Sequence, residues 1–373
     1  MQLKENQLLF METLHLMRNI RLTPQTNIEL ATLRSQKWEI YNSSQPVTVL
    51  IKGQPFKFRE GLTFTPFANA VPCNAHCRFC SEELQQKENH QPTALHYITD
   101  YEQYFTALEQ AILAVKNLHI GLSLSGLEAT AEPIWLLRFL EILKKIQPVF
   151  QFDEKVLYTN GSGLLKYPKL IPALQAVGFD RIELSRCHPD QTINQSIMYF
   201  NRNEAIWQNT HYETLIKNLQ GKLFIKNSCI LTKKGTQTIE DIEAYLLWAI
   251  DLGITEVVLR ELSRLDDSYM PNPTLKWVEE NRVPIEPLLQ EIAPSYSEVR
   301  VDWKYLYSTV GYYYYNEHFL YQNKLEVILE TSSYAALESA NQTGIVHKMV
   351  FHSNGNLCGG WNPDTNIIAN FFK

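Results

Sequence analysis

Strand-like and helix-like segments alternate between residues 62 and 262, and this alternation constrains the fold more than any other feature of the sequence. A Thr- and Phe-rich stretch beginning at Leu62 predicts a strand, and residues 100–118 then show helical periodicity with Asp100 as N-cap. About six such units follow one another. The alternation implies a parallel sheet with right-handed crossovers, and six units suffice for a partial barrel without closing a ring of eight. We therefore predict an α/β fold whose core, at 62–262, is a partial (β/α)6 TIM-like barrel.

The two flanks of this core have different patterns. Residues 1–61 predict a short N-terminal extension made of an amphipathic helix and a hairpin at 48–58. Residues 263–373 begin with a proline-marked linker and then become strand-rich, which predicts a small antiparallel module that packs against the barrel as a lid or as a wall of the substrate pocket. Its tyrosines 312–315 fit either a pocket wall or an ordinary half-buried sheet.

Composition limits the cellular compartments and the classes of partner that suit this protein. A net charge of −6 without basic runs offers no footprint for a nucleic-acid backbone. No stretch approaches the roughly 18 apolar residues of a membrane span, and the first 20 residues lack the continuous apolar region of a signal peptide. The six cysteines are too few and too unevenly spaced for a disulfide framework. We expect a cytoplasmic protein without nucleic-acid or membrane partners.

Three of the six cysteines, Cys73, Cys77 and Cys80, gather in the stretch "CNAHCRFC". In a reducing compartment this clustering indicates a metal site. Zinc needs four ligands, usually as two pairs, and a second pair is missing; His76 would need strained geometry to serve as the fourth ligand. An iron–sulfur cubane needs four thiolates to saturate its irons, so three leave one iron open for chemistry. Zinc remains the alternative.

The spacing of these cysteines, with Phe79 just before the last, resembles the radical S-adenosylmethionine (radical SAM) superfamily. The resemblance implies one [4Fe-4S] cluster on Cys73, Cys77 and Cys80, with the open iron chelated by the amino and carboxylate groups of SAM. It also implies cleavage of SAM to methionine and a 5′-deoxyadenosyl radical, a flavodoxin- or ferredoxin-like electron donor, and the same partial barrel. Phe79 would lie against the adenine, although it also fits a core aromatic.

Four further residues that the resemblance selects lie at the ends of the second and third predicted strands, the edge where parallel barrels hold their active sites. In "SGLEATAEP", Gly126 and Glu128 match the family's Gly-Gly-Glu-like segment, with Leu127 replacing the middle glycine, and would face the SAM ammonium group. In "YTNGSG", Thr159 and Asn160 would lie beside the methionine part of SAM. Each segment taken alone also fits a simple strand-end turn.

Ser185, Arg186 and Cys187 follow one another at the end of the fourth predicted strand. By resemblance, Ser185 and Arg186 would hold the ribose hydroxyls and the SAM carboxylate, since arginine suits bidentate carboxylate pairing; a surface ion pair is the alternative for Arg186. Cys187 could donate a hydrogen atom to a substrate radical, although a lone cysteine is more often a small buried residue. Cys229 suits packing in the fifth strand, and Cys358 suits a glycine-rich loop.

These observations predict an enzyme that reductively cleaves SAM and takes a hydrogen atom from a small metabolite or natural-product intermediate. The three other cysteines contain no Cys-X-X-Cys, so the auxiliary cluster of many peptide-modifying relatives is not expected. A peptide-modifying maturase or epimerase is the first alternative, and activation of a glycyl-radical partner follows it. A non-catalytic zinc or iron–sulfur protein is the alternative of a different class.

Overall fold

The computed structural model describes residues 20–22, 46–68, 70–84, 97–263, 265, 267–294, 298–311, 313–333, 340 and 342–372. The predicted N-terminal helix and Tyr312 lie outside the described residues. The predicted hairpin is formed by β2 (Val47–Ile51), which pairs antiparallel with β3 (Gln54–Pro66) across a turn at Lys52 and Gly53.

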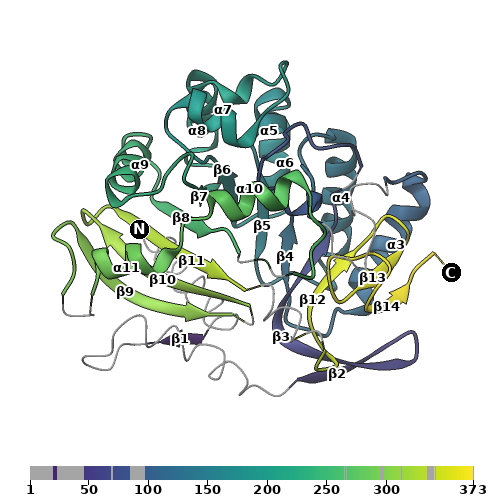
Figure 1. Ribbon diagram of the computed structural model, residues 1–373. Coiled ribbons are helices and arrows are strands. Elements are labelled where there is room, and N and C mark those ends of the chain that lie inside the picture. Colours follow the sequence, from purple (N-terminus) through teal and green to yellow (C-terminus); the bar gives the residue numbers. More distant parts are fainter. Residues whose placement is uncertain are drawn as a thin grey trace, which may run out of the picture.

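The six predicted strand–helix units are confirmed. Their strands are β3, β4 (Gly121–Leu124), β5 (Lys155–Thr159), β6 (Arg181–Ser185), β7 (Phe224–Leu231) and β8 (Glu256–Glu261), and each is parallel to the next. The helices between them are α3 (Tyr101–Ala114), α4 (Pro133–Ile146), α5 (Ser162–Lys166), α6 (Leu170–Ala176), α7 (Gln191–Met198), α8 (Asn209–Leu219) and α9 (Ile239–Asp251), with short 3-10 turns at Ser81–Glu83 and Ala205–Trp207. Figure 1 shows these helices on the outer side of the strands.

Local sequence chemistry sets the helix boundaries. Asp100 accepts a hydrogen bond from the Gln103 amide at the start of α3, as its N-cap position predicts. At the start of α9, Thr238 and Asp241 form a capping box in which each side chain accepts from the other's backbone amide. Each cap satisfies amides that have no partner inside the helix, so the helices begin where the sequence places these residues.

After β8 the chain forms α10 (Pro273–Asn281) and α11 (Ile285–Ile292) and then two groups of strands. The first group is β9 (Trp303–Val310), β10 (Tyr314–Tyr321) and β11 (Leu325–Ser332), and the second is β12 (Ile345–Phe351), β13 (Asn356–Cys358) and β14 (Ile367–Asn370). Neighbours within each group are antiparallel, as predicted. Cys358, expected in a loop, instead ends strand β13, because its stretch pairs with both β12 and β14.

The two C-terminal groups continue the barrel sheet at its opposite edges. The strand order is β1-β9-β10-β11-β8-β7-β6-β5-β4-β3-β12-β13-β14, with β1 (Ile20–Leu22) at one end. Strand β11 runs parallel to β8, and β12 runs parallel to β3, so eight parallel strands are neighbours. Figure 1 shows β9–β11 on one side of the molecule and β12–β14 on the other. Pairing satisfies the backbone groups that the six-unit core would otherwise expose at its edges. The division at residues 61 and 262 stays a prediction.

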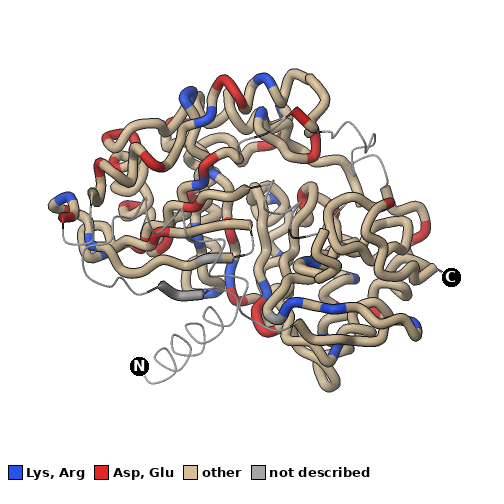
Figure 2. The backbone as a smooth tube through the Cα atoms, turned by 60° about the horizontal axis from the view of Figure 1, so that its bottom comes forward, with Lys and Arg blue, Asp and Glu red and all other residues tan. Residues whose placement is uncertain are grey.

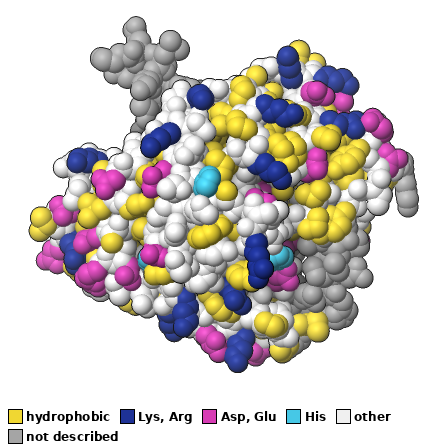
Figure 3. Space-filling model, turned by 90° about the horizontal axis from the view of Figure 1, so that it is seen from above, with side chains coloured by type: hydrophobic (Ala, Val, Ile, Leu, Met, Phe, Trp, Pro, Cys, Tyr) yellow, Lys and Arg dark blue, Asp and Glu magenta, His cyan; other side chains and the backbone are white. Residues whose placement is uncertain are grey.

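Charged side chains are spread over the outside and also enter the interior. Seen from above, Lys and Arg side chains are interspersed with Asp and Glu side chains (Figure 3). Along the backbone in Figure 2, Lys or Arg positions and Asp or Glu positions also lie close together near the middle of the view. Among the described residues, no helix combines the length and apolar character needed to cross a membrane.

The parallel pairing of β11 with β8 predicts that the C-terminal segment is part of the main core. Leu329 on β11 is 1% exposed, whereas Leu50 on β2 is 67% exposed. We expect Leu329→Ala to lower the free energy of unfolding by about 2–5 kcal/mol, as for other buried leucines, and Leu50→Ala to change it little. Denaturant unfolding measures both. A Leu329→Ala protein as stable as the Leu50→Ala control would contradict this placement.

Candidate active site

The cysteine-bearing loop lies between β3 and α3 and is fastened to the segment around α7. The His76 amide donates to the carbonyl of Tyr199 at 2.9 Å, and the Arg78 amide donates to that of Ile197 at 2.9 Å. An isolated bridge pairs Ala75 with Phe200. These backbone bonds hold the loop against a helix that follows β6, so the loop reaches across the strand ends.

The three thiols of this loop are partly buried and electrostatically coupled. Burial raises the pKa of Cys73 to about 12 and that of Cys80 to about 11, and it raises the pKa of Cys77 as well. Cys80 further raises the pKa values of Cys73 and Cys77, because two thiolates repel each other. Thiolates in this setting need a strong positive charge beside them, which metal ions supply.

Among the described residues, no three His, Cys, Asp or Glu side chains converge tightly enough to hold one metal ion. An iron–sulfur cubane makes a different demand from a single ion, because each thiolate binds its own iron and the sulfurs stay apart. The donor set of the loop, three neighbouring thiols without a fourth, fits a cubane with one open iron.

Glu128 is a buried carboxylate that joins the ends of β4 and β5. Its Oε1 accepts from the hydroxyls of Thr130 and Thr159, both at 2.6 Å, and from the Thr130 amide. Its Oε2 accepts from the Asn160 amide at 2.7 Å. Burial raises the pKa of Glu128, while these hydrogen bonds act in the opposite direction. Three of the residues predicted to surround SAM, namely Glu128, Thr159 and Asn160, are thus in direct contact.

Asn74, inside the cysteine loop, connects that loop to the end of β5. Its Oδ1 accepts from Asn160 Nδ2 at 2.9 Å, and its Nδ2 donates to Ser162 Oγ at 2.6 Å. The Ser162 amide donates in turn to Asn160 Oδ1. The cysteine loop, through Asn74, and three of the predicted SAM-contacting residues, Glu128, Thr159 and Asn160, therefore belong to one hydrogen-bond network.

Two glycines allow this network to pack closely. Gly126 has a φ of +118°, and a Cβ there would lie 2.8 Å from the Ala68 backbone nitrogen. At Gly163, in the first turn of α5, a Cβ would lie 1.9 Å from the Thr130 carbonyl oxygen. Both positions exclude a side chain, so the backbones after β3, β4 and β5 approach within direct contact.

Arg186 is buried, and protein groups bind all three of its guanidinium nitrogens. Nε donates to the His188 carbonyl, Nη1 to the Trp207 carbonyl at 3.2 Å, and Nη2 to Asn209 Oδ1. The guanidinium also lies over the ring of Tyr212. These contacts fasten the segment after β6, and a contact of Arg186 with SAM stays a prediction.

Phe79, Ser185 and Cys187 occupy different positions around the cysteine loop. Phe79 is half-buried and packs against the core, and Ser185 ends β6. Cys187 is 1% exposed, and it lies near enough to Cys77 to raise the pKa of that thiol. Its carbonyl accepts from Cys229 Sγ at 3.3 Å. Cys187 therefore faces the cysteine loop and the fifth barrel strand.

A cavity of about 310 Å³ lies inside the parallel strands. Ser125 and Tyr158, which line it, directly precede Gly126 and Thr159 of the predicted SAM site. Tyr313 and Tyr314 close part of it, so the tyrosine stretch contributes to the pocket wall, while Tyr315 is fully buried in β10. The described residues that line this cavity do not include Cys187.

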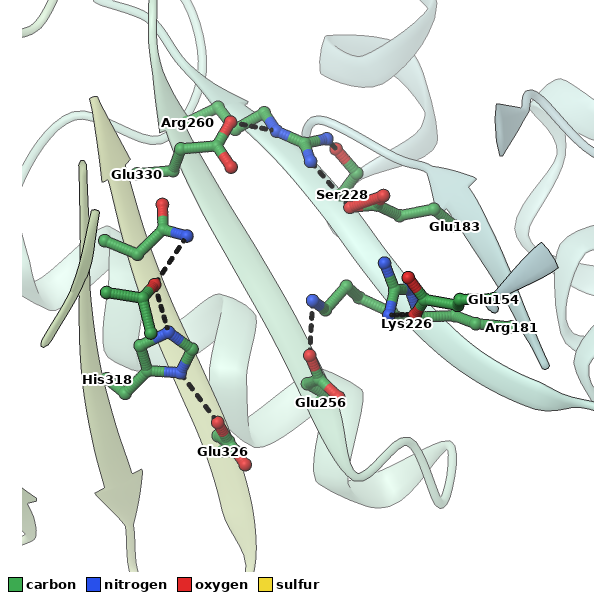
Figure 4. A network of polar contacts seen from close by, with 12 residues as sticks. Glu154, Arg181, Glu183, Lys226, Ser228, Glu256, Arg260, His318, Glu326 and Glu330 are labelled. Carbon is green, nitrogen blue, oxygen red and sulfur yellow. Dashed lines mark hydrogen bonds and ion pairs between the residues drawn. The ribbon is translucent and has the colours of Figure 1, made fainter. Parts of the chain in front are cut away.

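Charged side chains fill much of this cavity wall as paired groups (Figure 4). Arg260 on β8 donates to Glu183, Ser228 and Glu330, each at 2.6 Å, and so links β6, β7 and β11. Arg181 pairs with Glu154 at 2.7 Å, and Lys226 pairs with Glu256. Buried charges need such partners because their hydration is lost.

Sequence reasoning missed several residues that contribute to this site. Asn74 lies within the quoted cysteine stretch, but a single asparagine carries no signal of its partner. Arg260 and Lys348 are charged residues inside strand-like stretches, at "EVVLREL" and "HKMVF". A charge in an otherwise apolar barrel strand was the available signal, because such a strand has its outer face covered by helices.

No family model matches this sequence, and no curated protein matches it. Among solved structures, SuiB from Streptococcus suis bound to S-adenosylmethionine aligns with a TM-score of 0.46 and 14% identity, over 85% of this chain and 65% of SuiB. The anSMEcpe protein with bound AdoMet and the Cp18Cys peptide gives 0.47 and 13%, over 84% and 78%. Coproporphyrinogen III oxidase (HemN) from Escherichia coli, a radical SAM enzyme, gives 0.38 and 14%, over 70% and 67%.

The chain thus spans about 65% of the length of SuiB, and the matched structures include radical SAM enzymes. With TM-scores below 0.5, these likenesses establish no family on their own. The assignment of function therefore depends on the cysteine loop, the Glu128 network and the cavity.

The role of Asn74 predicts that its removal loosens the cysteine loop. Asn74→Ala deletes two hydrogen bonds that together contribute about 1–3 kcal/mol. We expect the His76 and Arg78 amides to exchange with solvent about tenfold faster or more, measured by hydrogen exchange. The matched control is Asn203→Ala, at an exposed position in a turn. Unchanged exchange in Asn74→Ala would show that the backbone contacts alone hold the loop.

The Arg260 network predicts a pH-dependent loss of stability. Burial alone would raise the pKa of Glu183, but the charges of Arg260, Lys226 and Arg181 outweigh it and lower this pKa. Ionised Glu183 therefore stabilises the fold above the unfolded-state pKa of about 4.3, and this contribution disappears as pH falls. We expect Arg260→Met to lower the free energy of unfolding by about 3–5 kcal/mol at neutral pH, because it leaves Glu183 buried without its main counter-charge.

The free energy of unfolding lost in Arg260→Met should shrink in acid, as pH falls through the lowered pKa of Glu183 and this carboxylate becomes protonated. Denaturant unfolding at neutral pH and in acid measures this, with the exposed Arg202→Met as control. A cost that stays constant with pH would mean that Arg260 acts through packing and not through its charge.

Proposed function

We propose that this chain is a radical SAM enzyme. The observation that carries the proposal is the hydrogen-bond network from Glu128 through Asn160 to Asn74, which joins Glu128, Thr159 and Asn160, three of the residues expected around SAM, to the three-cysteine loop. The cysteine spacing and the parallel barrel support the same assignment.

Cys73, Cys77 and Cys80 would hold the [4Fe-4S] cluster, which, when bound, supplies the electron that cleaves SAM to methionine and a 5′-deoxyadenosyl radical. The residues around them have separate tasks. Asn74 orients the loop, and Glu128 fixes the strand ends after β4 and β5. Gly126 leaves its backbone exposed for the amino group of SAM, and Phe79 offers an apolar face to the adenine.

Two other assignments concern the segment after β6. Ser185 would contact the ribose of SAM, and Arg186, already bound by three protein groups, would position the segment that carries this contact. A hydrogen-donor role for Cys187 requires it to reach the substrate. Since Cys187 faces the cysteine loop, the cavity supports such a role less than it supports simple packing.

The substrate, in this proposal, is a small metabolite or natural-product intermediate in the cavity beside the SAM site. The cavity volume of about 310 Å³ is at the lower end of the range for small-molecule sites, roughly 300–1,000 Å³. Its wall runs up to Ser125 and Tyr158, next to the residues assigned to SAM. A radical formed there would be close to a substrate held among the strands, and the surrounding side chains would exclude water.

Two further elements complete the proposal. The electron would come from a flavodoxin- or ferredoxin-like donor, and a reducing compartment such as the cytoplasm would keep the thiols available.

Peptide modification is the first alternative, since SuiB has been solved with its precursor peptide SuiA. Tight binding of a leader peptide by the isolated protein would favour that alternative. A zinc site without sulfide would favour a non-catalytic metal protein. Analysis of bound zinc, iron and sulfide distinguishes such a protein from a radical SAM enzyme.

The decisive test is SAM cleavage by the reconstituted protein. After anaerobic reconstitution with iron and sulfide, dithionite and SAM should yield 5′-deoxyadenosine, measured by chromatography. We expect Cys77→Ala to abolish this product, because it removes one cluster ligand. Cys358→Ala, which replaces a buried cysteine on β13, should retain it. A wild-type protein with a filled cluster and no nucleoside product would refute the proposal.

A further inference from the structure

One cation of the cavity wall differs from its neighbours in its partners. Arg181, Lys226 and Arg260 each pair with a carboxylate. Lys348, on β12, lines the same cavity and is 7% exposed. Among the described residues, no carboxylate lies within ion-pair distance of its ammonium group, which lies over the face of Trp361, 3.8 Å from the centre of the ring.

A buried ammonium group without a counter-charge is costly, and burial lowers the pKa of Lys348 to about 7. An anion bound beside Nζ would restore the charged form and replace the lost hydration. The ring of Trp361 covers one side of the ammonium group by a cation–π contact. Lys348 also lines the cavity, from which an anion can approach it.

The opposite wall of the cavity offers a complementary group. Glu183 is 1% exposed, and its Oε1 is bound by Arg260, but its Oε2 is buried without a hydrogen-bond partner. Leaving a buried carboxylate oxygen unpaired costs free energy, and because this oxygen is itself buried, the amine or hydroxyl group of a ligand pairs with it when the Glu183 side chain turns toward the cavity. Glu183 stands on β6 and Lys348 on β12, four strand positions apart along the curved sheet. Both line one cavity.

We propose that the cavity binds a small acid that also carries an amine or hydroxyl group, with its acid group on Lys348 and its donor group on Glu183 Oε2. This proposal rests on the proposed function, because it names the substrate class of that site. The contacts to the two walls would hold the molecule inside the barrel with a fixed direction. Lys348 is then a binding residue that selects acids over neutral molecules.

The test measures binding and needs neither cluster nor SAM. The probes are the ω-amino acids 3-aminopropanoate, 4-aminobutanoate, 5-aminopentanoate and 6-aminohexanoate, each compared with the amide of its acid group. Isothermal titration calorimetry of the full chain, with and without reconstituted cluster, gives their dissociation constants. We expect at least one ω-amino acid to bind at least tenfold more tightly than its amide.

Three variants assign that preference to its residue. Lys348→Met keeps an apolar stem without charge and should lose the preference for the acid. Lys348→Arg keeps the charge and should retain it, and Lys116→Met, an exposed position after α3, should behave as wild type. The proposal is overturned if Lys348→Met keeps the preference, or if no probe binds the wild-type chain better than its amide.

The binding experiment and the SAM-cleavage experiment test the two proposals independently, so either proposal can be refuted without the other. A chain that prefers the acid through Lys348 but yields no 5′-deoxyadenosine would keep this site and lose the radical assignment. A chain that yields the nucleoside but shows no acid preference would keep the radical assignment and lose this substrate class.

Discussion

The site depends on one buried carboxylate. Glu128 accepts four hydrogen bonds from groups at or beyond the ends of two adjacent strands, and one of the donor residues, Asn160, reaches the cysteine loop through Asn74. A buried carboxylate is stable only when such donors surround it, so the strand ends and Glu128 constrain one another. The loop that carries the three thiols is positioned on this rigid base.

The interior of the barrel follows a second electrostatic constraint. Its walls carry charges of both signs, and Arg260 alone joins three strands through Glu183, Ser228 and Glu330. In contrast to these pairs, Lys348 has no carboxylate partner among the described residues, and Glu183 Oε2 is buried without a hydrogen-bond partner. A polar interior of this kind suits a ligand with two opposite polar groups, whereas a hydrophobic core would fill the same space with side chains.

Much of this arrangement could be predicted from short stretches of sequence. The order of strands and helices from 62 to 262 is confirmed, because hydrophobic periodicity and caps such as Asp100 act locally. That Glu128, Thr159 and Asn160 meet followed from the rule that parallel strands end at one edge. The contacts of Arg186 could not be predicted, since its partners include carbonyl groups of residues 188 and 207, which sequence cannot rank above a bound cofactor.

The sequence by itself determined the six-unit core, the loop with three thiols and the strand character of the C-terminal segment. Only the tertiary structure decided that this segment divides, with β11 beside β8 and β12 beside β3, and that Lys348 thereby enters the cavity without a carboxylate partner among the described residues. The physical reason is that strand formation depends on the local alternation of apolar and polar side chains. The choice of a neighbouring strand, and of the partner for a buried charge, depends on long-range contacts that many similar stretches could satisfy.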